Sequence, residues 1–408
     1  MPEYKLPDVG EGLTEAEIVV WKVKVGDVIA INDIVVDIET AKSIVELPSP
    51  YAGEVTALLV AEGETVAVGT PIIAIGEPVS DAATPSPEMD LSNPAASGGP
   101  EEGAFPVTIK HKYGETTIEK APERVVCLGL TDQDTLMALG VVPVGITYWF
   151  GDEKLQGVYP WAQDYLGDAE LPTVLKDTNG VELEKVASLA PDLIIGAYSG
   201  LTEQDYKKLS GLGVPVVAQN GDYADYGTPW EEAALMLGTA IGQPKAAQEL
   251  IDGAKQLIAD GAATHPEFKG QTAAVATPYE GLFLYGPEDP RSRLLTDLGF
   301  DLHSLITDAD DSEFGVSVSA ERASDLGDVG VAVWFDLASV KQVDTLFQGT
   351  TAGKEGRWMD ISEADGSFYV AHSFVTPLSI PYTLERYLPM LAAAADGDPK
   401  TEVPSPAA

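Results

Sequence analysis

The stretch from Gly76 to Gly103, which reads GEPVSDAATPSPEMDLSNPAASGGPEEG, is the feature that most limits how this chain can fold. It is dense in Pro, Ser, Ala, Gly and acids and has almost no aliphatic or aromatic side chains. Such a segment cannot offset the conformational entropy lost on ordering, so we expect an extended tether. The tether separates a module of about 75 residues from one of about 290, and the two have different sequence textures.

The composition narrows the class of protein. The 408 residues include 24 basic and 65 acidic residues, and the resulting net charge of −41 would repel nucleic-acid phosphates, so we exclude nucleic acid as a partner. No apolar run is long enough to cross a bilayer. The single cysteine, Cys127, leaves no internal disulfide. The first residues lack a basic patch followed by an apolar run, so the chain as written carries no secretory signal and would be cytoplasmic.

The first module contains an internal repeat. GDVIAINDIVVDI starts at Gly26 and GETVAVGTPIIAI starts at Gly63, an offset of 37 residues. Each copy reads as a Gly turn, a short strand, a polar turn and an apolar strand. Duplicated β units of this kind predict a small all-β sandwich, or flattened barrel, built from two similar sheets.

A lysine lies at the midpoint of this module, in the motif DIETAKS at residues 37–43. Apolar residues alternate before the motif at Ile34, Val36 and Ile38 and resume after it at Ile44. This pattern predicts a hairpin with Lys42 exposed at its tip. The alternative is an ordinary solvated turn lysine.

Together, VGEG at residues 9–12, ETAKS at 39–43, Ser49-Pro50 and Gly53 resemble the lipoyl domain of the dihydrolipoyl acyltransferase component of 2-oxo acid dehydrogenase complexes. The resemblance covers the whole first module. It implies that Lys42 carries lipoic acid by an amide bond and that lipoate ligase and the dehydrogenase components are partners. A truncated acyltransferase component is an alternative. However, none of the four histidines lies in the His-x-x-x-Asp-Gly signature of the acyltransferase domain.

In the second module, predicted strands alternate with predicted helices, which indicates an α/β fold with parallel sheets. Residues 229–265 form a strongly helical stretch, with a break near Gly242-Gln243-Pro244, long enough to be a spine between two lobes. The predicted strands are 125–129, 143–147, 192–196, 214–218, 272–276, 329–334 and 367–370, and the predicted helices outside the spine are 132–139, 183–190, 204–209, 293–298, 340–347 and 381–395.

Four motifs in order carry a second resemblance: PERVV at 122–126, LG with PVG at 139–145, LAPDLI at 189–194 and LLTDLGF at 294–300. With the long spine, they resemble the substrate-binding proteins of ABC importers, in the class with a single-helix hinge that captures ferric siderophores, haem or cobalamin. The resemblance spans nearly the whole second module. It implies a ferric siderophore as ligand, an ABC permease as partner and recognition rather than catalysis. Haem or another bulky cofactor is the alternative ligand.

A cleft that holds a bulky, anionic iron chelate needs aromatic faces and a few cations. In open α/β sheets such residues lie in loops at the carboxyl ends of strands. A core aromatic or a solvated arginine is the alternative for each candidate. The predicted ligand-binding residues are Trp149, Tyr198, Tyr279, Tyr285, Arg291, Arg293, Trp334 and Phe374.

Two acids are candidates for docking to the permease. The resemblance implies one glutamate on each lobe for this role, and the matching positions are Glu184 and Glu321. An ordinary exposed helix acid is the alternative. The scattered histidines favour neither direct zinc nor manganese binding, and no hydrolase, Walker or dinucleotide motif points to an enzyme.

The predicted chain is therefore a non-catalytic fusion of a lipoyl carrier and a siderophore receptor. The carrier works in the cytoplasm and the receptor outside the membrane, so both an artificial joining and a natural single gene stay open. The predicted divisions are a lipoyl domain at 1–76, a linker at 77–104, an N-lobe at 105–228, a spine helix at 229–268, a C-lobe at 269–396 and a disordered tail at 397–408.

Overall fold

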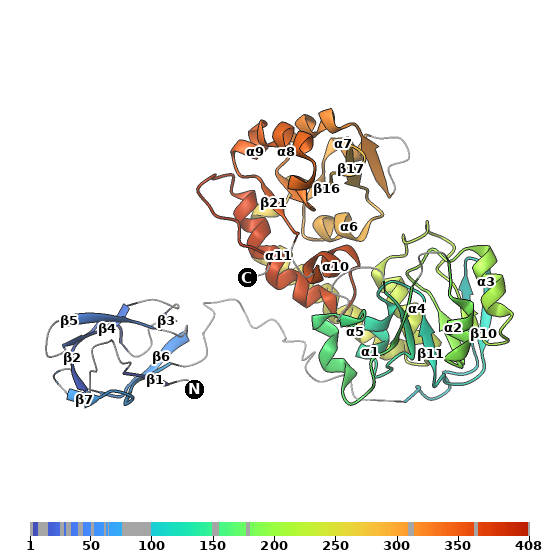
Figure 1. Ribbon diagram of the computed structural model, residues 1–408, viewed down its shortest axis with the longest axis horizontal. Coiled ribbons are helices and arrows are strands. Elements are labelled where there is room, and N and C mark those ends of the chain that lie inside the picture. Colours follow the sequence, from blue (N-terminus) through green and yellow to red (C-terminus); the bar gives the residue numbers. More distant parts are fainter. Residues whose placement is uncertain are drawn as a thin grey trace. The chain divides into compact units, whose positions relative to one another are not determined.

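The computed structural model describes residues 3–6, 15–24, 28–29, 34–39, 44–49, 53–60, 63, 65–75, 99–148, 155–176, 180–308, 314–362 and 366–406. Its contacts divide the chain into two compact units, Met1–Pro87 and Glu88–Ala408 (Figure 1). Lys42, Trp149 and residues 77–98 of the predicted linker lie outside the described residues. Within the described residues, no helix combines the length and the hydropathy needed to cross a membrane.

The first unit is the predicted all-β sandwich, with two antiparallel four-stranded sheets in the orders β1-β8-β6-β3 and β5-β4-β2-β7. Buried side chains from both sheets share one hydrophobic cluster, as alternating apolar strands require. The strands are β1 (Glu3–Lys5), β2 (Glu15–Trp21), β3 (Val28–Ile29), β4 (Ile34–Glu39), β5 (Ile44–Pro48), β6 (Gly53–Leu58), β7 (Thr65–Ala67) and β8 (Pro71–Ile75).

The sequence repeat extends to the irregularities of the strands. The pairing of β4 with β5 shifts register between Ile34 and Val36, so Val35 is an extra residue in its strand. The pairing of β1 with β8 also shifts register: Tyr4 pairs with Ile73 and Lys5 with Pro71, so Ile72 is an extra residue in its strand. Val35 and Ile72 are 37 residues apart and both are fully buried. A bulge lets two consecutive residues of one strand face the core, so each copy of the repeat contributes the same packing device.

The second unit has two lobes, each built on its own sheet (Figure 1). In the N-lobe, β13-β12-β11-β14-β15 is entirely parallel, and the hairpin of β9 and β10 lies beside it. The N-lobe elements are β9 (Val107–His111), β10 (Gly114–Ile118), β11 (Val125–Cys127), α1 (Asp132–Ala138), β12 (Gly145–Thr147), η2 (Pro160–Leu166), β13 (Thr173–Leu175), α2 (Leu183–Ser188), β14 (Leu193–Ile195), α3 (Glu203–Ser210) and β15 (Val216–Val217).

The C-lobe sheet is mixed, in the order β19-β17-β16-β20-β21, and β18 also pairs with β16. The antiparallel pairs are β16 with β17 and β17 with β19. The C-lobe elements are η3 (Pro266–Phe268), β16 (Thr272–Thr277), β17 (Leu282–Tyr285), α6 (Pro290–Asp297), β18 (Asp301–Leu302), α7 (Ser304–Thr307), β19 (Gly315–Val318), η4 (Ala320–Asp328), β20 (Val331–Trp334), η5 (Leu337–Ser339), α8 (Lys341–Gln348), α9 (Thr351–Lys354), β21 (Trp358–Asp360), α10 (Ser367–Ser373) and α11 (Ser379–Ala395).

The predicted spine is two helices, α4 (Trp230–Ala240) and α5 (Pro244–Thr264). They separate at Gly242, whose φ of 80° is left-handed and favours glycine. Helix α5 joins the lobes because its first half packs in the N-lobe cluster with Ala247 and Leu250, and its second half packs in the C-lobe cluster with Ala254 and Ile258. The break near residues 242–244 is thus confirmed.

Residues at the end of the predicted linker are attached to this break. The Glu101 N–H donates to the Gly242 carbonyl at 2.8 Å, and the Glu101 carboxylate accepts from the Lys245 N–H at 2.7 Å. The second contact caps the start of α5 with a negative charge, where the helix dipole favours one.

One predicted strand is wrong. Residues 367–370 belong to helix α10, in which all residues from Ser367 to Ser373 are buried. A short apolar run is ambiguous because a fully buried helix and a fully buried strand have the same apolar surface on every side. The strand at this edge of the sheet is β21 instead.

The crossing of α4 and α5 generates a first prediction. A Cβ atom at Gly238 would lie 2.3 Å from the Cβ of Ala247, so Gly238→Ala should lower the free energy of unfolding by roughly 1–3 kcal/mol, although Ala is the better helix former. Denaturant unfolding measures this change. Adding Ala247→Gly removes the clash and should restore most of the loss; a double variant no more stable than Gly238→Ala would contradict the packing argument.

Candidate functional site

Side chains from both lobes of the second unit line an open cavity of about 590 Å³. The described lining is mainly aromatic, as the chemistry of a bulky, partly apolar ligand requires. The N-lobe supplies its side chains from the loops after β11, β14 and β15, which are carboxyl ends of parallel strands. The lining residues are Leu130, Tyr198, Tyr226, Thr277, Tyr279, Phe283, Tyr285, Arg291, Phe314, Ser317, Phe335, Tyr369 and Phe374.

The aromatic rings of the cavity hold one another in place. Phe335 stacks on Tyr369 with 3.8 Å between ring centroids. Tyr198, from the N-lobe, meets Phe374, from the end of α10, edge to face at 6.1 Å. Edge-to-face and offset contacts suit the charge distribution of aromatic rings, so these pairs stabilise the walls of the cavity.

One arginine lines the described part of the cavity, and its charge is already balanced. Arg291 is 6% exposed and donates to both oxygens of the fully buried Asp289, each at 2.7 Å. Its guanidinium also lies 3.5 Å from the centroid of the Tyr285 ring and donates to the Ser373 hydroxyl at 3.3 Å. Burial opposes the charge, but Asp289 dominates and raises the pKa of Arg291.

The local sequence explains this arrangement. Asp289 is the N-cap of α6 and accepts from the Arg291 N–H at 3.0 Å, while Pro290 occupies the first helical position. Asp-Pro is a strong helix start, and it places the carboxylate beside the arginine of the first turn. Burial raises the pKa of the neighbouring Tyr285 hydroxyl to about 12, although Arg291 acts in the opposite direction.

Two fully buried acids on α1 accept hydrogen bonds from the segments that form the cavity wall. The Asp132 carboxylate accepts from the Ala197 and Tyr198 N–H groups at 2.7 and 3.1 Å. The Asp134 carboxylate accepts from the Trp161 ring N–H at 2.7 Å and from the Thr376 hydroxyl at 2.9 Å. Asp132 therefore fixes the loop that carries Tyr198, and Asp134 ties α1 to the segment before α11.

Burial raises the pKa of Asp132 to about 7 and that of Asp134 to about 6, against the hydrogen bonds, which lower both. The cost of a charge in this wall is the physical cause. Groups that face the pair include the Cys127 thiol and the Tyr159 hydroxyl, neither of which is cationic.

The structure brings five predicted ligand residues together at the cavity: Tyr198, Tyr279, Tyr285, Arg291 and Phe374. Of these, Tyr279 is the most open, with 66% of its surface exposed. A further candidate, Trp149, lies outside the described residues.

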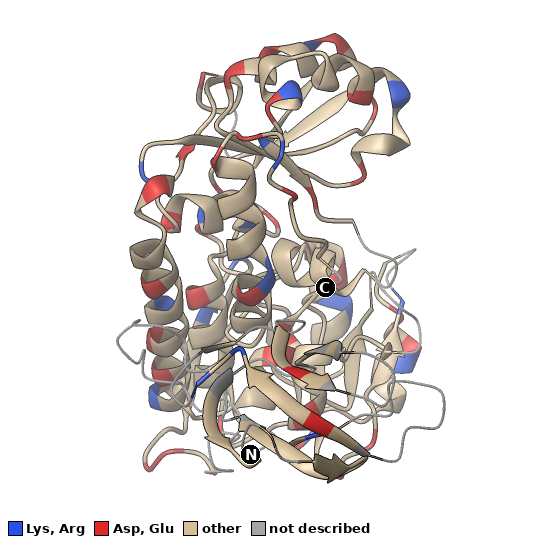
Figure 2. Cartoon of the chain, turned by 90° about the vertical axis from the view of Figure 1, so that its left-hand side faces the viewer, with Lys and Arg blue, Asp and Glu red and all other residues tan. Residues whose placement is uncertain are grey.

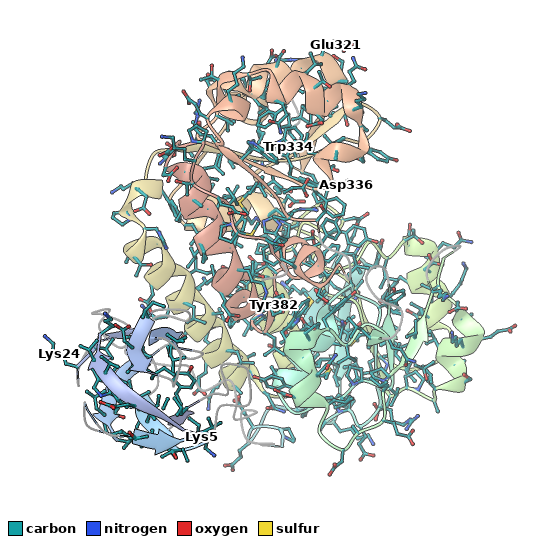
Figure 3. The ribbon with its side chains drawn as sticks, turned by 60° about the vertical axis from the view of Figure 1, so that its left-hand side comes forward. Lys5, Lys24, Glu321, Trp334, Asp336 and Tyr382 are labelled. Atoms are coloured by element: carbon teal, nitrogen blue, oxygen red, sulfur yellow. The ribbon has the colours of Figure 1, made fainter. Side chains whose placement is uncertain are left out.

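Trp334 is a core residue and does not line the cavity. It is fully buried in the C-lobe, where Figure 3 labels it. Its ring packs edge to face on that of Phe347, with 5.0 Å between the centroids. Successive residues of a strand point to opposite sides, so the next residue, Phe335, faces the cavity instead.

Arg293, which was predicted to bind the ligand, does not line the described cavity either. Both terminal nitrogens of its guanidinium donate to the Gly227 carbonyl at 3.2 Å, which links α6 to the N-lobe. Residues 291 and 293 are two positions apart in helix α6 and therefore point to different sides of the helix, so only one of the two arginines reaches the cavity.

The list of predicted ligand-binding residues leaves out six aromatic or apolar residues that line the cavity. The rule that ligand residues follow the carboxyl ends of parallel strands could have predicted Tyr226, since Tyr226 lies in the loop after β15. Leu130 and Phe335 likewise follow the predicted parallel strands β11 and β20. Phe283 is on the antiparallel strand β17, Phe314 precedes β19 and Tyr369 is on α10, and the sequence did not reveal the positions of these three elements. The missed residues are Leu130, Tyr226, Phe283, Phe314, Phe335 and Tyr369.

The two docking candidates are exposed on separate lobes. Glu184 is in the first turn of α2, and Glu321 is in η4 at the outer edge of the C-lobe, where Figure 3 labels it. The Glu321 carboxylate accepts from the Gln342 side chain at 3.1 Å. Acidic residues are spread over helices and loops of both lobes rather than gathered at one place (Figure 2), so charge alone does not single out these two. Among the described residues, no three His, Cys, Asp or Glu side chains form a metal-ligand cluster.

Two sheets with interlobe helices and an aromatic cavity define a two-lobed α/β binding protein. The family model described as "Periplasmic binding protein" matches residues 125–362, more than half of the chain, and the chain belongs to that family. The model described as "Biotin-requiring enzyme" matches residues 2–75. The chain thus joins a lipoyl-type domain to a periplasmic binding protein.

Solved structures and curated proteins agree with this division. The ferrichrome complex of PiaA from Streptococcus pneumoniae TIGR4 is 29% identical, with a TM-score of 0.63 over 72% of this chain and 99% of that one. A periplasmic solute binding protein from Mycobacterium smegmatis is 33% identical, with a TM-score of 0.62 over 71% of this chain and 98% of that one.

The dihydrolipoyllysine-residue acetyltransferase component of the pyruvate dehydrogenase complex from Staphylococcus aureus is 38% identical over 123 residues. This match covers 29% of this chain and only 29% of the curated relative. The chain thus spans less than a third of the length of this relative, and residues 125–362 match the periplasmic binding protein model instead.

The buried acids of α1 generate a second prediction. Their folded pKa values of about 7 and about 6 lie above the unfolded value of 3.8, so the folded state binds more protons and its stability falls as the pH rises from about 4 to about 7. Asp134→Asn should remove the part of this loss that is due to Asp134, roughly 2–3 kcal/mol of unfolding free energy summed over the pH range.

Asparagine suits position 134 because Oδ2 of Asp134 accepts both hydrogen bonds while Oδ1 has no partner, so an amide group can replace the carboxylate. Denaturant unfolding at a series of pH values provides the measurement. Identical slopes for the variant and the wild type would contradict the raised pKa of Asp134.

Proposed function

We propose that the second unit binds a ferric siderophore for an ABC importer and that the first unit carries lipoic acid on Lys42. The observation that carries the first part is the aromatic cavity between the lobes of a periplasmic binding protein. The similar PiaA structure contains ferrichrome, which supports this class of ligand for the present chain. Both units recognise or carry a group, and neither role requires a catalytic residue.

The balance of charge in the cavity limits which class of ferric chelate can bind. Arg291 is paired with Asp289, so the pair brings no net positive charge to a ligand. An anionic chelate would lose its hydration without gaining a countercharge from this pair. Three hydroxamates neutralise Fe³⁺, whereas three catecholates leave a net charge of −3. We therefore infer a ferric chelate of low net charge, in place of the anionic chelate expected from the sequence.

A ligand screen tests this proposal. Intrinsic fluorescence of the full chain should be quenched by a ferric tris-hydroxamate, and a ferric tris-catecholate should bind at least about tenfold more weakly because its charge is not compensated. Haem forms a third arm of the screen. Quenching by haem alone, or by none of the three compounds, would overturn the ferric siderophore as ligand.

Tyr279 provides a specific variant for the same assay. Because its side chain is on the open side of the cavity, Tyr279→Ala should weaken binding of the tris-hydroxamate about three- to tenfold while leaving the melting temperature unchanged. Leu235→Ala, an exposed residue of α4 away from the cavity, is the control.

The pairing of β4 with β5 in the first unit supports the proposal that Lys42 is the carrier lysine. Strands β4 and β5 pair antiparallel up to Glu39 opposite Ile44, so only residues 40–43 connect them. Lys42 is in this connection, which lies outside the described residues. A short connection between paired strands is where a ligase gains access to a lysine amine.

Lipoylation generates a further prediction. Incubation of the full chain with lipoate ligase, ATP and lipoate should add one lipoyl group, and Lys42→Arg should abolish the addition because arginine cannot form the amide. Intact-mass spectrometry measures the product. Lys5→Arg and Lys24→Arg replace exposed lysines of the same unit (Figure 3) and should leave the addition intact; a lipoyl group on Lys42→Arg would refute the assignment.

Glu184 and Glu321 are proposed to dock to the permease because each is exposed on a different lobe. Replacing both by alanine should reduce ferric chelate uptake in a reconstituted transporter about tenfold or more while leaving chelate affinity unchanged, since neither residue lines the described cavity. Glu203→Ala, an exposed acid in the first turn of α3, is the matched control. Unchanged uptake by the double variant would remove the docking role.

A further inference from the structure

Tyr226 is the cavity residue whose backbone most needs support. It is in the segment between β15 and α4 and has a φ of 62°, in the left-handed region that non-glycine residues avoid. Its N–H donates to the Ser199 carbonyl at 3.2 Å. Such a conformation persists only where the surroundings fix it, and it often marks a functional position.

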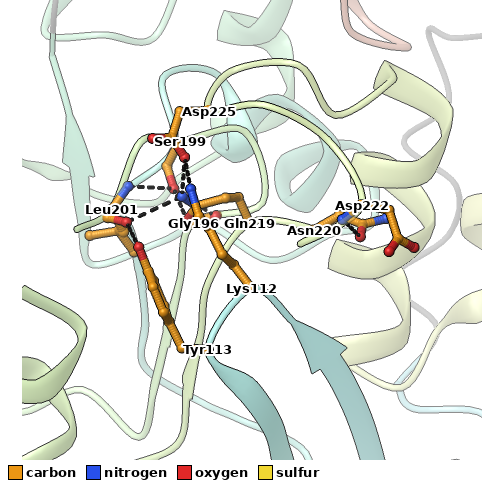
Figure 4. Close-up of polar contacts among 9 residues, drawn as sticks. All are labelled: Lys112, Tyr113, Gly196, Ser199, Leu201, Gln219, Asn220, Asp222 and Asp225. Carbon is orange, nitrogen blue, oxygen red and sulfur yellow. Dashed lines mark hydrogen bonds and ion pairs between the residues drawn. The ribbon is translucent and has the colours of Figure 1, made fainter. Parts of the chain in front are cut away.

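The N-lobe fixes this segment through Gln219 (Figure 4). Gln219 is fully buried, and its amide nitrogen donates to the Asp225 carboxylate at 2.7 Å and to the Leu201 carbonyl at 3.2 Å. Its amide oxygen accepts from the Ser199 hydroxyl at 3.2 Å. Gln219 thus holds the residue immediately before Tyr226 from inside the protein, where hydrogen bonds count most.

A second contact with Asp225 comes from the surface. The Lys112 ammonium, in the β9–β10 hairpin, lies 2.6 Å from the Asp225 carboxylate (Figure 4). The two side chains are 33% and 48% exposed, so solvent screens this ion pair. The buried amide of Gln219 is therefore the main support on this side.

The C-lobe fixes the same segment from the opposite side. Arg293 of α6 donates from both terminal nitrogens to the carbonyl of Gly227, the residue immediately after Tyr226. Gly227 is buried. The Tyr226 ring itself lies against the backbone of Gly200, where an added Cβ would come within 2.7 Å of it. Tyr226 is consequently held by the N-lobe on one side and by the C-lobe on the other.

We propose that Gln219 and Arg293 are positioning residues that set Tyr226 in the ligand cavity, one from each lobe. Neither residue lines the described cavity, so each acts on the ligand through Tyr226. Because the Arg293 contact crosses between the lobes, the position of Tyr226 depends on how the lobes meet. The ligand part of this inference rests on the proposed siderophore function, whereas the positioning of Tyr226 does not.

The positioning is tested without ligand by ¹⁹F NMR of the full chain labelled with 3-fluorotyrosine. The Tyr226 resonance is assigned by its loss in Tyr226→Phe. Gln219→Met and Arg293→Met should each shift or broaden that resonance. Gln256→Met and Arg322→Met make the same substitutions at exposed positions and should leave it unchanged. A Tyr226 resonance that neither Gln219→Met nor Arg293→Met alters would overturn the proposal.

A double-mutant cycle tests the effect on the ligand. Each of Gln219→Met and Arg293→Met should weaken ferric tris-hydroxamate binding about five- to tenfold in the wild type and much less in the Tyr226→Ala background, because the contact they support is then gone. A residue with a merely structural role would give the same fold-change in both backgrounds, and that result would also overturn the proposal.

The two tests separate the two ideas. If the wild type binds none of the chelates, the siderophore function fails and the proposed effect on the ligand fails with it, while the ¹⁹F measurement still decides whether Gln219 and Arg293 position Tyr226. If chelate binds and the cycle is additive, the siderophore function stands and the positioning role is lost. Should Gln219→Met fail to fold, Arg293→Met, a half-buried position, gives the same readouts.

Discussion

The packing of α5 in two hydrophobic clusters is the constraint on which the second unit depends. The first half of the helix buries Ala247 and Leu250 in the N-lobe cluster, and the second half buries Ala254 and Ile258 in the C-lobe cluster. A single helix of 21 residues that is buried at both ends cannot bend without losing apolar contacts. The lobes are therefore held with their strand ends facing one cavity.

Within that frame, buried carboxylates do the positioning. Asp289 neutralises Arg291 and caps α6, Asp132 holds the loop of Tyr198, and Asp134 reaches Thr376 across the unit. Each carboxylate has hydrogen-bond donors in place of water, which is the condition for a tolerable buried acid. The result is an aromatic cavity of fixed shape whose charge is already balanced, in a chain of net charge −41. Such a cavity selects by shape and by aromatic contact more than by charge.

The structure places the candidate residues from the sequence differently. Tyr198 follows a parallel strand and lines the cavity, whereas Trp334 ends a strand and points into the core, with Phe335 taking its place. Arg291 and Arg293 look alike in the sequence, but one enters the cavity and the other joins the lobes. The assignment of residues 367–370 as a strand failed because a short run buried on all sides has no periodicity to read.

The sequence by itself determined that two unrelated modules are joined, that the first is a duplicated β sandwich, and that the second is an α/β module with a helical spine. These features are local: they follow from composition, from a repeat of 37 residues and from apolar periodicity. Only the tertiary structure decided which side of each strand faces the cavity, that Asp134 reaches Thr376, and that Gln219 and Arg293 bond the residues on either side of Tyr226 from the two lobes. Those outcomes depend on contacts between residues distant in the chain, and no local pattern encodes the direction in which a side chain finally points.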